Sequence, residues 1–211
     1  MEKLDLTKKY RQYFAAKAKP ELVEIEPAHF LSIAGKGNPS EKGFSDKVQA
    51  LYATAYAIKF IFKSLNKDFI VSKLEGLWWF EEQRYKGLSI AEAPKKVPRS
   101  EWEYRLLIRM PDFVTQGEVS TAIQTVLTKK KLTLANNIEL YKMHEGTSVQ
   151  MLHTGPFDKE PETLQQMSEF MKSNHLQKNG LHHEIYLSDF NKTAPAKLKT
   201  ILREPVISIY N

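Results

Sequence analysis

The sequence predicts an α+β fold of two similar βαββ halves, about residues 21–112 and 113–211, whose antiparallel sheets form a central ligand groove. Two observations support this. In each half a strand pattern leads through a glycine-containing turn to a helix, and two further strand patterns follow. The turn segments Ser32–Pro39 and Gln150–Pro156 hold equivalent places in that order. Such a duplicated unit buries its helices on one face of the sheet. The other face, or the seam between the halves, is then left for a ligand.

In the first half, segments with the alternating pattern of a strand take turns with segments whose apolar residues recur at helical spacing. We expect an N-terminal helical extension over residues 1–20, with a helix at Leu4–Lys17 that Pro20 ends. The elements expected after it are a strand at Leu22–Ala34, a helix at Phe44–Leu65, a strand at Phe69–Glu82, an irregular connection at 83–100 and a strand at Trp102–Met110. Gly76 marks either a bulge or the meeting of two strands.

The second half opens with a helix. The elements expected there are a helix at Glu118–Lys131, a hairpin of Ile138–His144 with Ser148–His153 across Glu145-Gly146, a helix at Glu160–His175, a strand at Leu181–Asp189, a turn or short helix at Thr193–Leu202 and a last strand at Pro205–Tyr210.

Composition limits the class of protein. The chain has 211 residues, of which 42% are hydrophobic and 11% aromatic, as in a folded globule of one large or two small domains. No run of about 18 apolar residues predicts a membrane span, and the N-terminus lacks the apolar region of a secretory signal. The chain has no cysteine, which excludes disulfides and thiolate nucleophiles and fits a reducing compartment. We therefore expect a cytoplasmic protein.

The net charge of +6 does not form a nucleic-acid footprint, because acidic residues interleave with the basic ones. The densest basic run, Lys129–Lys131, ends a predicted helix, where lysines suit the helix dipole. We expect no nucleic-acid partner. The oligomeric state is not indicated.

The strand at Leu181–Asp189 carries the strongest candidate for a functional residue. Alternation puts His182, Glu184 and Tyr186 on one face. Ile185 lies on the other face, which suits a core. A carboxylate inside a strand is disfavoured by propensity and costly if buried alone. Glu184 is therefore a candidate for a binding or catalytic role. The alternative is a partly exposed acid of an edge strand, paired with an arginine or lysine.

Aromatic residues supply the other candidates. Trp79 and Trp102 could sandwich a flat ligand by stacking, although most tryptophans are structural core residues. Adjacent strand residues point to opposite faces, so either Trp78 or Trp79 reaches the groove. Tyr56 could donate its hydroxyl to a ligand carbonyl. Tyr104 is a lesser candidate of the same kind, as is Tyr186, and a buried core tyrosine is the alternative for all three.

No cofactor or metal is expected. His182, His153 and Glu184 could in principle bind a metal, but their spacing matches no zinc motif. Gly35-Lys-Gly37 fits neither the dinucleotide nor the Walker phosphate loop, and no GxSxG nucleophile is present.

Several segments, taken in order, carry a family resemblance. They are Phe30-Leu-Ser-Ile-Ala-Gly-Lys-Gly37, Leu77-Trp-Trp79, Trp102-Glu-Tyr-Arg-Leu-Leu-Ile-Arg-Met-Pro111, Leu152-His-Thr-Gly-Pro-Phe157, Glu184-Ile-Tyr-Leu-Ser-Asp189 and Pro205-Val-Ile-Ser-Ile-Tyr210. Over about residues 20–211, the chain resembles the GyrI-like small-molecule-binding domain, which also serves as the effector domain of multidrug-sensing transcription regulators. The Trp-Trp and Arg-Met-Pro segments resemble its stand-alone branch.

The resemblance implies a fold and a site. The fold would be two pseudo-symmetric, SHS2-like βαββ units around a groove, and the site an aromatic cleft with a glutamate that matches Glu184. In the regulators this acid helps to bind cationic, lipophilic drugs. Some stand-alone members are hydrolases that open the cyclopropane ring of DNA-alkylating cyclopropanoid compounds. A regulator is disfavoured here, because residues 1–20 are too short for a helix-turn-helix.

Three hypotheses about function follow. In the first, the chain is a detoxifying hydrolase for a hydrophobic aromatic small molecule of the cyclopropanoid type. Glu184 would be the general base. Tyr56, Trp79 and Trp102 would hold and orient the ligand, with Tyr104, Tyr186 and His182 as further contacts. In the second, the same groove sequesters lipophilic cations without chemistry, through the Glu184 charge and cation–π contacts. The third is inhibition of a DNA-handling enzyme by direct binding.

Overall fold

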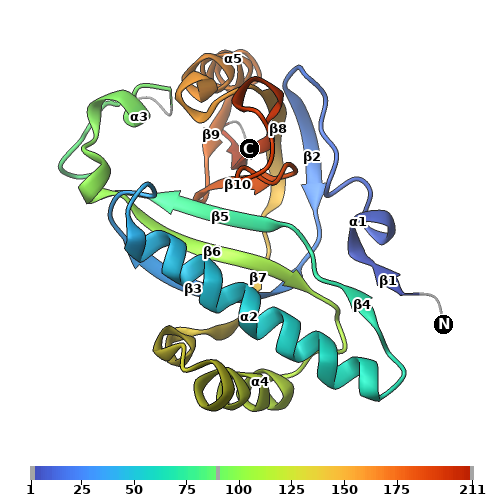
Figure 1. Cartoon of the computed structure of the whole chain (residues 1–211). Coiled ribbons are helices and arrows are strands. Elements are labelled where there is room, and N and C mark those ends of the chain that lie inside the picture. The colour runs from blue at the N-terminus through green and yellow to red at the C-terminus, as the bar shows by residue number, and fades with distance from the viewer. Residues whose placement is uncertain (1–2, 89–90, 210–211) are drawn as a thin grey trace.

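The computed structural model describes residues 3–88 and 91–209 and has the predicted α+β fold (Figure 1). Its first part contains β1 (Leu4–Asp5), α1 (Leu6–Lys9), β2 (Glu21–Ile25), β3 (Ala28–Lys36), α2 (Lys42–Ser64), β4 (Phe69–Ile70), β5 (Leu74–Trp79), α3 (Ala93–Lys96), the 3-10 turn Arg99–Glu101 and β6 (Glu103–Met110). Its second part contains α4 (Gln116–Lys130), the 3-10 turn Thr133–Asn137, β7 (Glu139–Met143), β8 (Gly146–Thr154), the 3-10 turn Phe157–Lys159, α5 (Glu160–Ser173), β9 (Leu176–Lys178), β10 (His182–Tyr186), the 3-10 turn Pro195–Lys197 and β11 (Lys199–Ser208).

One antiparallel sheet joins two equivalent halves, which confirms the predicted repeat. The unit β3–α2–β5–β6 in the first half matches β8–α5–β10–β11 in the second. In the sheet the strands run β2-β8-β11-β10-β5-β6-β3-β7, with β9 added beside β11. The middle strands of the two units, β5 and β10, therefore pair with each other. We call this pairing the seam.

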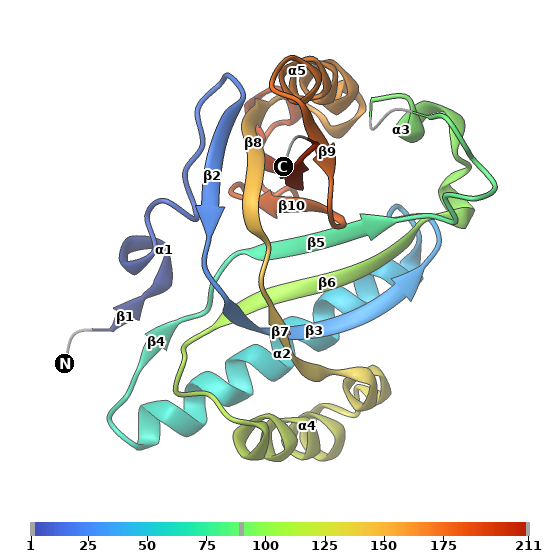
Figure 2. The ribbon, with the colours of Figure 1, turned by 180° about the vertical axis from the view of Figure 1, so that it is seen from behind.

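The outer strands are exchanged between the halves. β2 pairs with β8, and β7 pairs with β3. The register of one pairing continues into the other without a shift. β2–β3 and β7–β8 thus behave as two long strands that each bend once, and Figure 2 shows β2 beside β8. The predicted hairpin across Glu145-Gly146 is wrong, because β7 and β8 do not pair with each other. Gly146, at a φ of +63°, lies at the bend between the two strands. A bent strand and a hairpin show the same alternation, so the sequence did not separate them.

Two other predicted elements are wrong. Residues 4–17 are not one helix, because α1 ends at Lys9 and turns follow. Tertiary packing of Leu6, Tyr13 and Phe14 against the sheet decides this conformation. The last strand begins at Lys199 rather than Pro205. The turn or short helix predicted at Thr193–Leu202 is therefore confirmed only as the 3-10 turn Pro195–Lys197, and its last four residues are strand.

Pro205 made that strand hard to predict, because proline cannot donate to a ladder. The structure places Pro205 where the neighbour of β11 on one side changes from β10 to β9, so the ladder needs no N–H donor at this position. The predicted end of this strand, Tyr210, lies outside the described residues.

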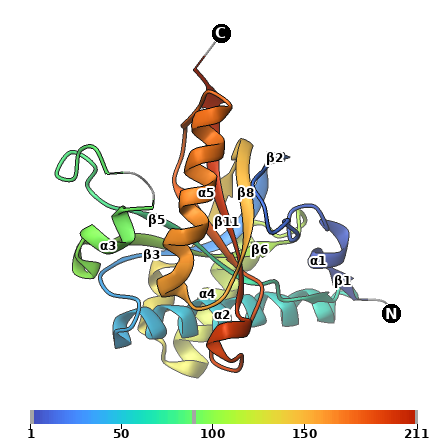
Figure 3. The same cartoon turned by 90° about the horizontal axis from the view of Figure 1, so that it is seen from above.

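Helices cover the two halves separately on one face of the sheet. α2 packs over β3 and β6, and α4 packs against α2 and β7, with Leu31, Leu106 and Ile108 among the buried residues of this cluster. α5 lies along β8 and β11 (Figure 3), where Leu164 and Met167 are buried. α2 and α5 therefore each cover their own half of the sheet, and neither helix covers the seam between the halves.

The N-terminal segment covers the other face. Leu6, Tyr13 and Phe14 pack on apolar side chains that point away from the helices, namely Phe30, Leu77, Leu107, Ile185 and Ile201. Together with the exchanged strands, this segment closes the side of the seam opposite the helices.

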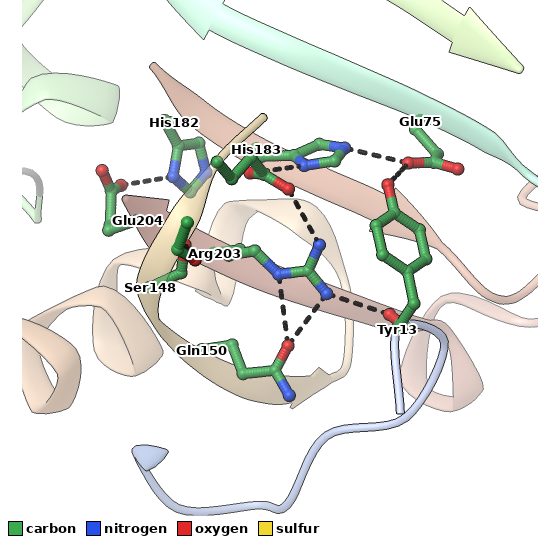
Figure 4. Close-up of polar contacts among 10 residues, drawn as sticks. Tyr13, Glu75, Ser148, Gln150, His182, His183, Arg203 and Glu204 are labelled. Carbon is green, nitrogen blue, oxygen red and sulfur yellow. Dashed lines mark hydrogen bonds and ion pairs between the residues drawn. The ribbon is translucent and has the colours of Figure 1, made fainter. Parts of the chain in front are cut away.

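A buried polar network fastens the N-terminal segment to the seam (Figure 4). The Tyr13 hydroxyl donates to Glu75. His183 contacts Glu75 through Nε2 at 3.0 Å and Glu145 through Nδ1 at 2.9 Å. Arg203 donates to Glu145 at 3.1 Å and to the Tyr13 carbonyl at 2.9 Å. We call these five residues the N-terminal network.

The charges in this network compensate one another. Burial opposes the charged form of His183, but the Glu145 and Glu75 carboxylates raise its pKa to about 8. Burial likewise opposes the Glu145 carboxylate, but His183 and Arg203 lower its pKa to about 2. Each buried ion therefore depends on its partners.

We predict that Tyr13→Phe destabilises the protein, because it removes one hydrogen bond from the buried Glu75 carboxylate. The expected loss in the free energy of unfolding is about 1–3 kcal/mol, measured by urea denaturation. Tyr10→Phe is the matched control, because the Tyr10 hydroxyl bonds the exposed Asp112 at 2.9 Å. It should change stability by less than about 0.5 kcal/mol. Equal effects of the two variants would contradict the proposed role of the network.

Candidate functional site

A cavity of about 1170 Å³ lies at the seam, on the face that carries the helices. Phe44 of α2 and Leu164 of α5 line it from the two halves, and Trp78 of β5 and Glu184 of β10 line it from the sheet. Of the two places expected for a ligand, the open face and the seam, the cavity occupies the seam. Its volume is large enough for a drug-sized molecule.

Aromatic rings form much of the cavity wall. Trp78 stacks on Phe44 with ring centres 6.0 Å apart and meets Trp102 edge-to-face at 6.4 Å. On the other side of the seam, Phe157 meets Tyr186 edge-to-face at 6.0 Å. Such rings offer broad apolar contact to a flat ligand at a low entropic cost.

Gly76 makes room for the central pair of this wall. In the seam register Gly76 lies opposite Glu184. A Cβ atom on Gly76 would come within 2.9 Å of Trp78 Nε1 and 3.1 Å of the Tyr186 hydroxyl. Those two groups are hydrogen-bonded, with Trp78 Nε1 donating to the Tyr186 hydroxyl at 3.1 Å. Gly76 thus occupies a regular strand position that only glycine fits. Of the adjacent residues Trp78 and Trp79, Trp78 has the ring that faces the cavity.

Charged groups form the polar end of the cavity. His182 Nε2 lies 3.4 Å from Glu184 Oε1, and its Nδ1 lies 2.5 Å from Glu204 Oε1. Burial opposes the charge on His182, but the two carboxylates raise its pKa to about 10. His182 is therefore an imidazolium at neutral pH, held between two glutamates. The Glu184 side chain remains 13% exposed, which leaves it accessible from the cavity.

A third carboxyl faces the same space. Glu160 is the first residue of α5, lines the cavity and is only 8% exposed. Burial and the neighbouring Glu184 charge raise the pKa of Glu160 well above its ordinary value. Burial and Glu184 also raise the pKa of the Tyr186 hydroxyl well above its ordinary range. The polar end thus places the charged His182 beside a carboxyl and a hydroxyl whose pKa values are raised, so that these two groups hold their protons more tightly than usual.

Five of the predicted site residues line the cavity, namely Glu184, Tyr186, His182, Trp102 and Trp79. The Trp79 ring, however, packs with the cluster on the opposite face of the sheet, and its Nε1 donates to Glu103 at 3.2 Å. Of the two tryptophans that alternation left open, Trp78 has its ring on the cavity face, and ligand binding by Trp79 stays a prediction.

Tyr56 and Tyr104 are not among the residues that line the cavity. Tyr56 is 45% exposed on α2, away from the cavity in which we predicted that its hydroxyl would hold the ligand and assist catalysis. Tyr104 is 1% exposed and packs edge-to-face on Phe44 behind the wall, so it is a core residue. Both predictions relied on sequence position along a helix or strand, which does not show where the cavity opens.

The sequence did not point to Glu160, Glu204 or Phe157. An acid in the first turn of a helix usually serves the helix dipole in solvent, so Glu160 gave no distinctive signal. Glu204 precedes Pro205 in a strand that was predicted to begin one residue later. A strand predicted to begin at Lys199 would have included Glu204, and alternation would then have shown on which face of the sheet its side chain lies.

Within residues 3–88 and 91–209, no three side chains of the usual metal-binding types are grouped to hold an ion. No helix in the same described part of the chain combines the length and the apolar character that a membrane crossing requires.

The cavity and its aromatic wall, at the seam of a duplicated βαββ sheet, define a small-molecule-binding protein. The chain belongs to the GyrI-like family, because the model of the GyrI-like small molecule binding domain matches residues 18–206. Among curated proteins no match is found.

Solved structures agree with this assignment. An uncharacterized conserved protein from Listeria innocua is 36% identical, with 97% of this chain and 100% of that chain covered at a TM-score of 0.85. A protein described as a hydrolase, also from Listeria innocua, is 35% identical, with 97% and 100% covered at a TM-score of 0.82. The C-terminal domain of EcmrR shares the fold at 13% identity, with 90% and 98% covered at a TM-score of 0.57.

We predict that His182 makes stability depend on pH. The folded protein raises the pKa of His182 to about 10. Its stabilisation is therefore complete below about pH 6.5, the value of a free imidazole, and is lost as the pH rises toward 10. Between pH 6.5 and 8.5 the free energy of unfolding should fall by roughly 2 kcal/mol more in the wild type than in His182→Gln.

Urea denaturation at the two pH values measures this difference. His144→Gln is the control, because His144 is an exposed histidine and should keep the wild-type pH dependence. Parallel pH dependences of the wild type and His182→Gln would contradict a charged His182.

Proposed function

We propose that this protein hydrolyses hydrophobic cyclopropanoid alkylating compounds, and so protects the cell, with Glu184 as the general base. The observation that carries the proposal is the Glu184 carboxylate in an aromatic cavity at the seam, with His182 as its one ion-pair partner among the described residues, 3.4 Å away. Such a carboxylate can be fixed in place and still accept a proton from water.

The geometry supports distinct roles for the neighbouring groups. Trp78, Trp102 and Tyr186 offer a flat aromatic ligand its main contact surface. Glu204 holds His182 at 2.5 Å, and His182 in turn orients Glu184. Glu184 takes a proton from a water molecule as that water attacks the methylene carbon of the strained ring. The ring bond breaks and its electrons move into the conjugated carbonyl.

The relatives support hydrolysis as the class of reaction. The Listeria innocua protein described as a hydrolase aligns along its whole length at 35% identity. The cyclopropanoid substrate is our proposal, because it matches the aromatic wall and the placement of one accessible carboxylate beside it.

A second function, sequestration of lipophilic cations, is favoured by the charges at the polar end. The Glu184 side chain is 13% exposed and lines the cavity, where the charge of a bound cation could pair with it. A cation enclosed by Trp78 and Trp102 would be stabilised by that carboxylate and by the ring faces.

We predict that Glu184→Gln abolishes turnover while the fold is retained. A cyclopropanoid alkylator is incubated with the protein, and the water adduct is followed by mass spectrometry. The variant should lose about 100-fold or more in kcat/KM, because the amide cannot accept the proton. Glu24→Gln, at an exposed acid on β2, is the control and should keep wild-type turnover.

Two outcomes would contradict hydrolysis. One is stoichiometric binding without turnover by the wild type, and the other is unchanged turnover in Glu184→Gln. If Glu184→Gln weakens the binding of cationic dyes but not of neutral aromatic compounds, sequestration is supported instead.

A further inference from the structure

Glu160 has a place in the cavity that the role of Glu184 does not explain. It comes from α5 in the second half, while Glu184 comes from β10, so two separate elements direct carboxyls into one cavity. Glu160 is more than nine-tenths buried. Its Oε1 atom is buried and has no hydrogen-bond partner among the described residues. An unpaired buried polar atom is costly, and in a binding cavity it indicates a group that a ligand satisfies.

The charged groups around Glu160 determine which form it takes. Glu184 and His182 face it from β10, and Arg99 faces it from the 3-10 turn before β6. The two cations favour an ionised Glu160, but burial and the Glu184 charge outweigh them, so the pKa of Glu160 lies well above its ordinary value. His182 is already paired with both Glu184 and Glu204. The cavity therefore presents two carboxyls, and Glu160 holds its proton more tightly than an ordinary glutamate does, as the acid of an acid–base pair must.

We propose that Glu160 is the general acid of the reaction and donates its proton to the substrate carbonyl oxygen while Glu184 removes a proton from the attacking water. This inference rests on the proposed hydrolysis. The water oxygen forms a bond to the ring methylene carbon, and the bond between that carbon and the conjugated ring system breaks. The released electron pair reaches the carbonyl oxygen, which takes the Glu160 proton and becomes a phenol. The net reaction adds one water molecule to the substrate.

The cycle closes without a co-reactant. After the step Glu184 is protonated and Glu160 is ionised. Exchange with solvent removes the proton from Glu184 and returns one to Glu160, so no oxidant or reductant is needed.

Other donors in the cavity are less suited to this role. The Tyr186 hydroxyl already accepts a hydrogen bond from Trp78 at 3.1 Å and lies beside Glu184, which makes release of its proton unfavourable. His182 lies between two carboxylates that stabilise its charge. Glu160 is the donor whose loss of a proton leaves an anion facing Arg99 and His182.

The test compares Glu160→Gln with Glu162→Gln. Glutamine has the shape of the protonated acid but carries no transferable proton. Glu162 lies two residues further along α5, is exposed and pairs with Lys159 at 3.2 Å, so it is a matched control. Glu160→Gln should lower kcat about 100-fold or more, while a neutral aromatic inhibitor binds within about threefold of wild type. Glu162→Gln should match the wild type, and Glu160→Asp should recover part of the loss.

The pH profile separates an acid from a structural residue. In the wild type kcat should fall on the alkaline side as Glu160 loses its proton, and Glu160→Gln should lack that fall. Wild-type turnover by Glu160→Gln, or an unchanged alkaline fall in that variant, would overturn the inference alone. If the wild type opens no cyclopropane ring, the proposed function fails together with the inference.

A measurement without turnover tests the protonation state. In protein labelled with ¹³C at glutamate side-chain carboxyls, the Glu160 signal is assigned by its absence in Glu160→Gln. It should be that of a protonated acid at pH 7, and in Glu184→Gln it should titrate at lower pH. An ionised Glu160 at pH 7 in the wild type would overturn the inference.

Discussion

The pairing of β5 with β10 is the constraint on which the rest of the molecule depends. Its register puts Glu184 opposite Gly76 on the cavity side and Ile185 opposite Glu75 on the other. Because strand side chains alternate, a slip of one residue would send Glu184 into the N-terminal network and His183 into the cavity. Groups on both faces oppose that slip. Trp78 and Tyr186 are bonded across the seam above Gly76, and Glu75 and His183 are bonded across it on the opposite side.

The same two strands carry charge on both faces, and each face compensates its charges differently. In the N-terminal network every ion meets a partner of opposite sign, as Glu145 meets both His183 and Arg203. That arrangement fixes structure. At the cavity, His182 serves two carboxylates and Glu160 has no partner of its own for Oε1. A carboxylate oxygen without a hydrogen-bond partner occurs on both faces, at Glu75 in the network and at Glu160 in the cavity. What distinguishes the cavity is that its carboxyl groups line open space that a ligand can fill.

Periodicity was sufficient to predict the repeated βαββ order, the long helix α2 and the strand that carries Glu184. These features depend on local alternation, which the sequence displays directly. It was not sufficient for pairings between distant segments. The bend at Gly146 has the signature of a hairpin, and only the partners β3 and β2 reveal its true form. In the site, Glu184 was predictable because a carboxylate interrupts an apolar strand. Glu160 was not, because its burial comes from the way α5 packs over the seam.

The exchange of β2 and β7 has a consequence for how the chain folds. Each half gives its first strand to the other, so neither half can complete its own sheet alone. The seam adds contacts between residues about a hundred positions apart, such as Trp78 and His182. The chain must close these long loops before the strands can pair, and the entropy lost on closing them slows folding. Because of the exchanged strands, we expect the two halves to unfold together and the ligand cavity between them to exist only when both are folded.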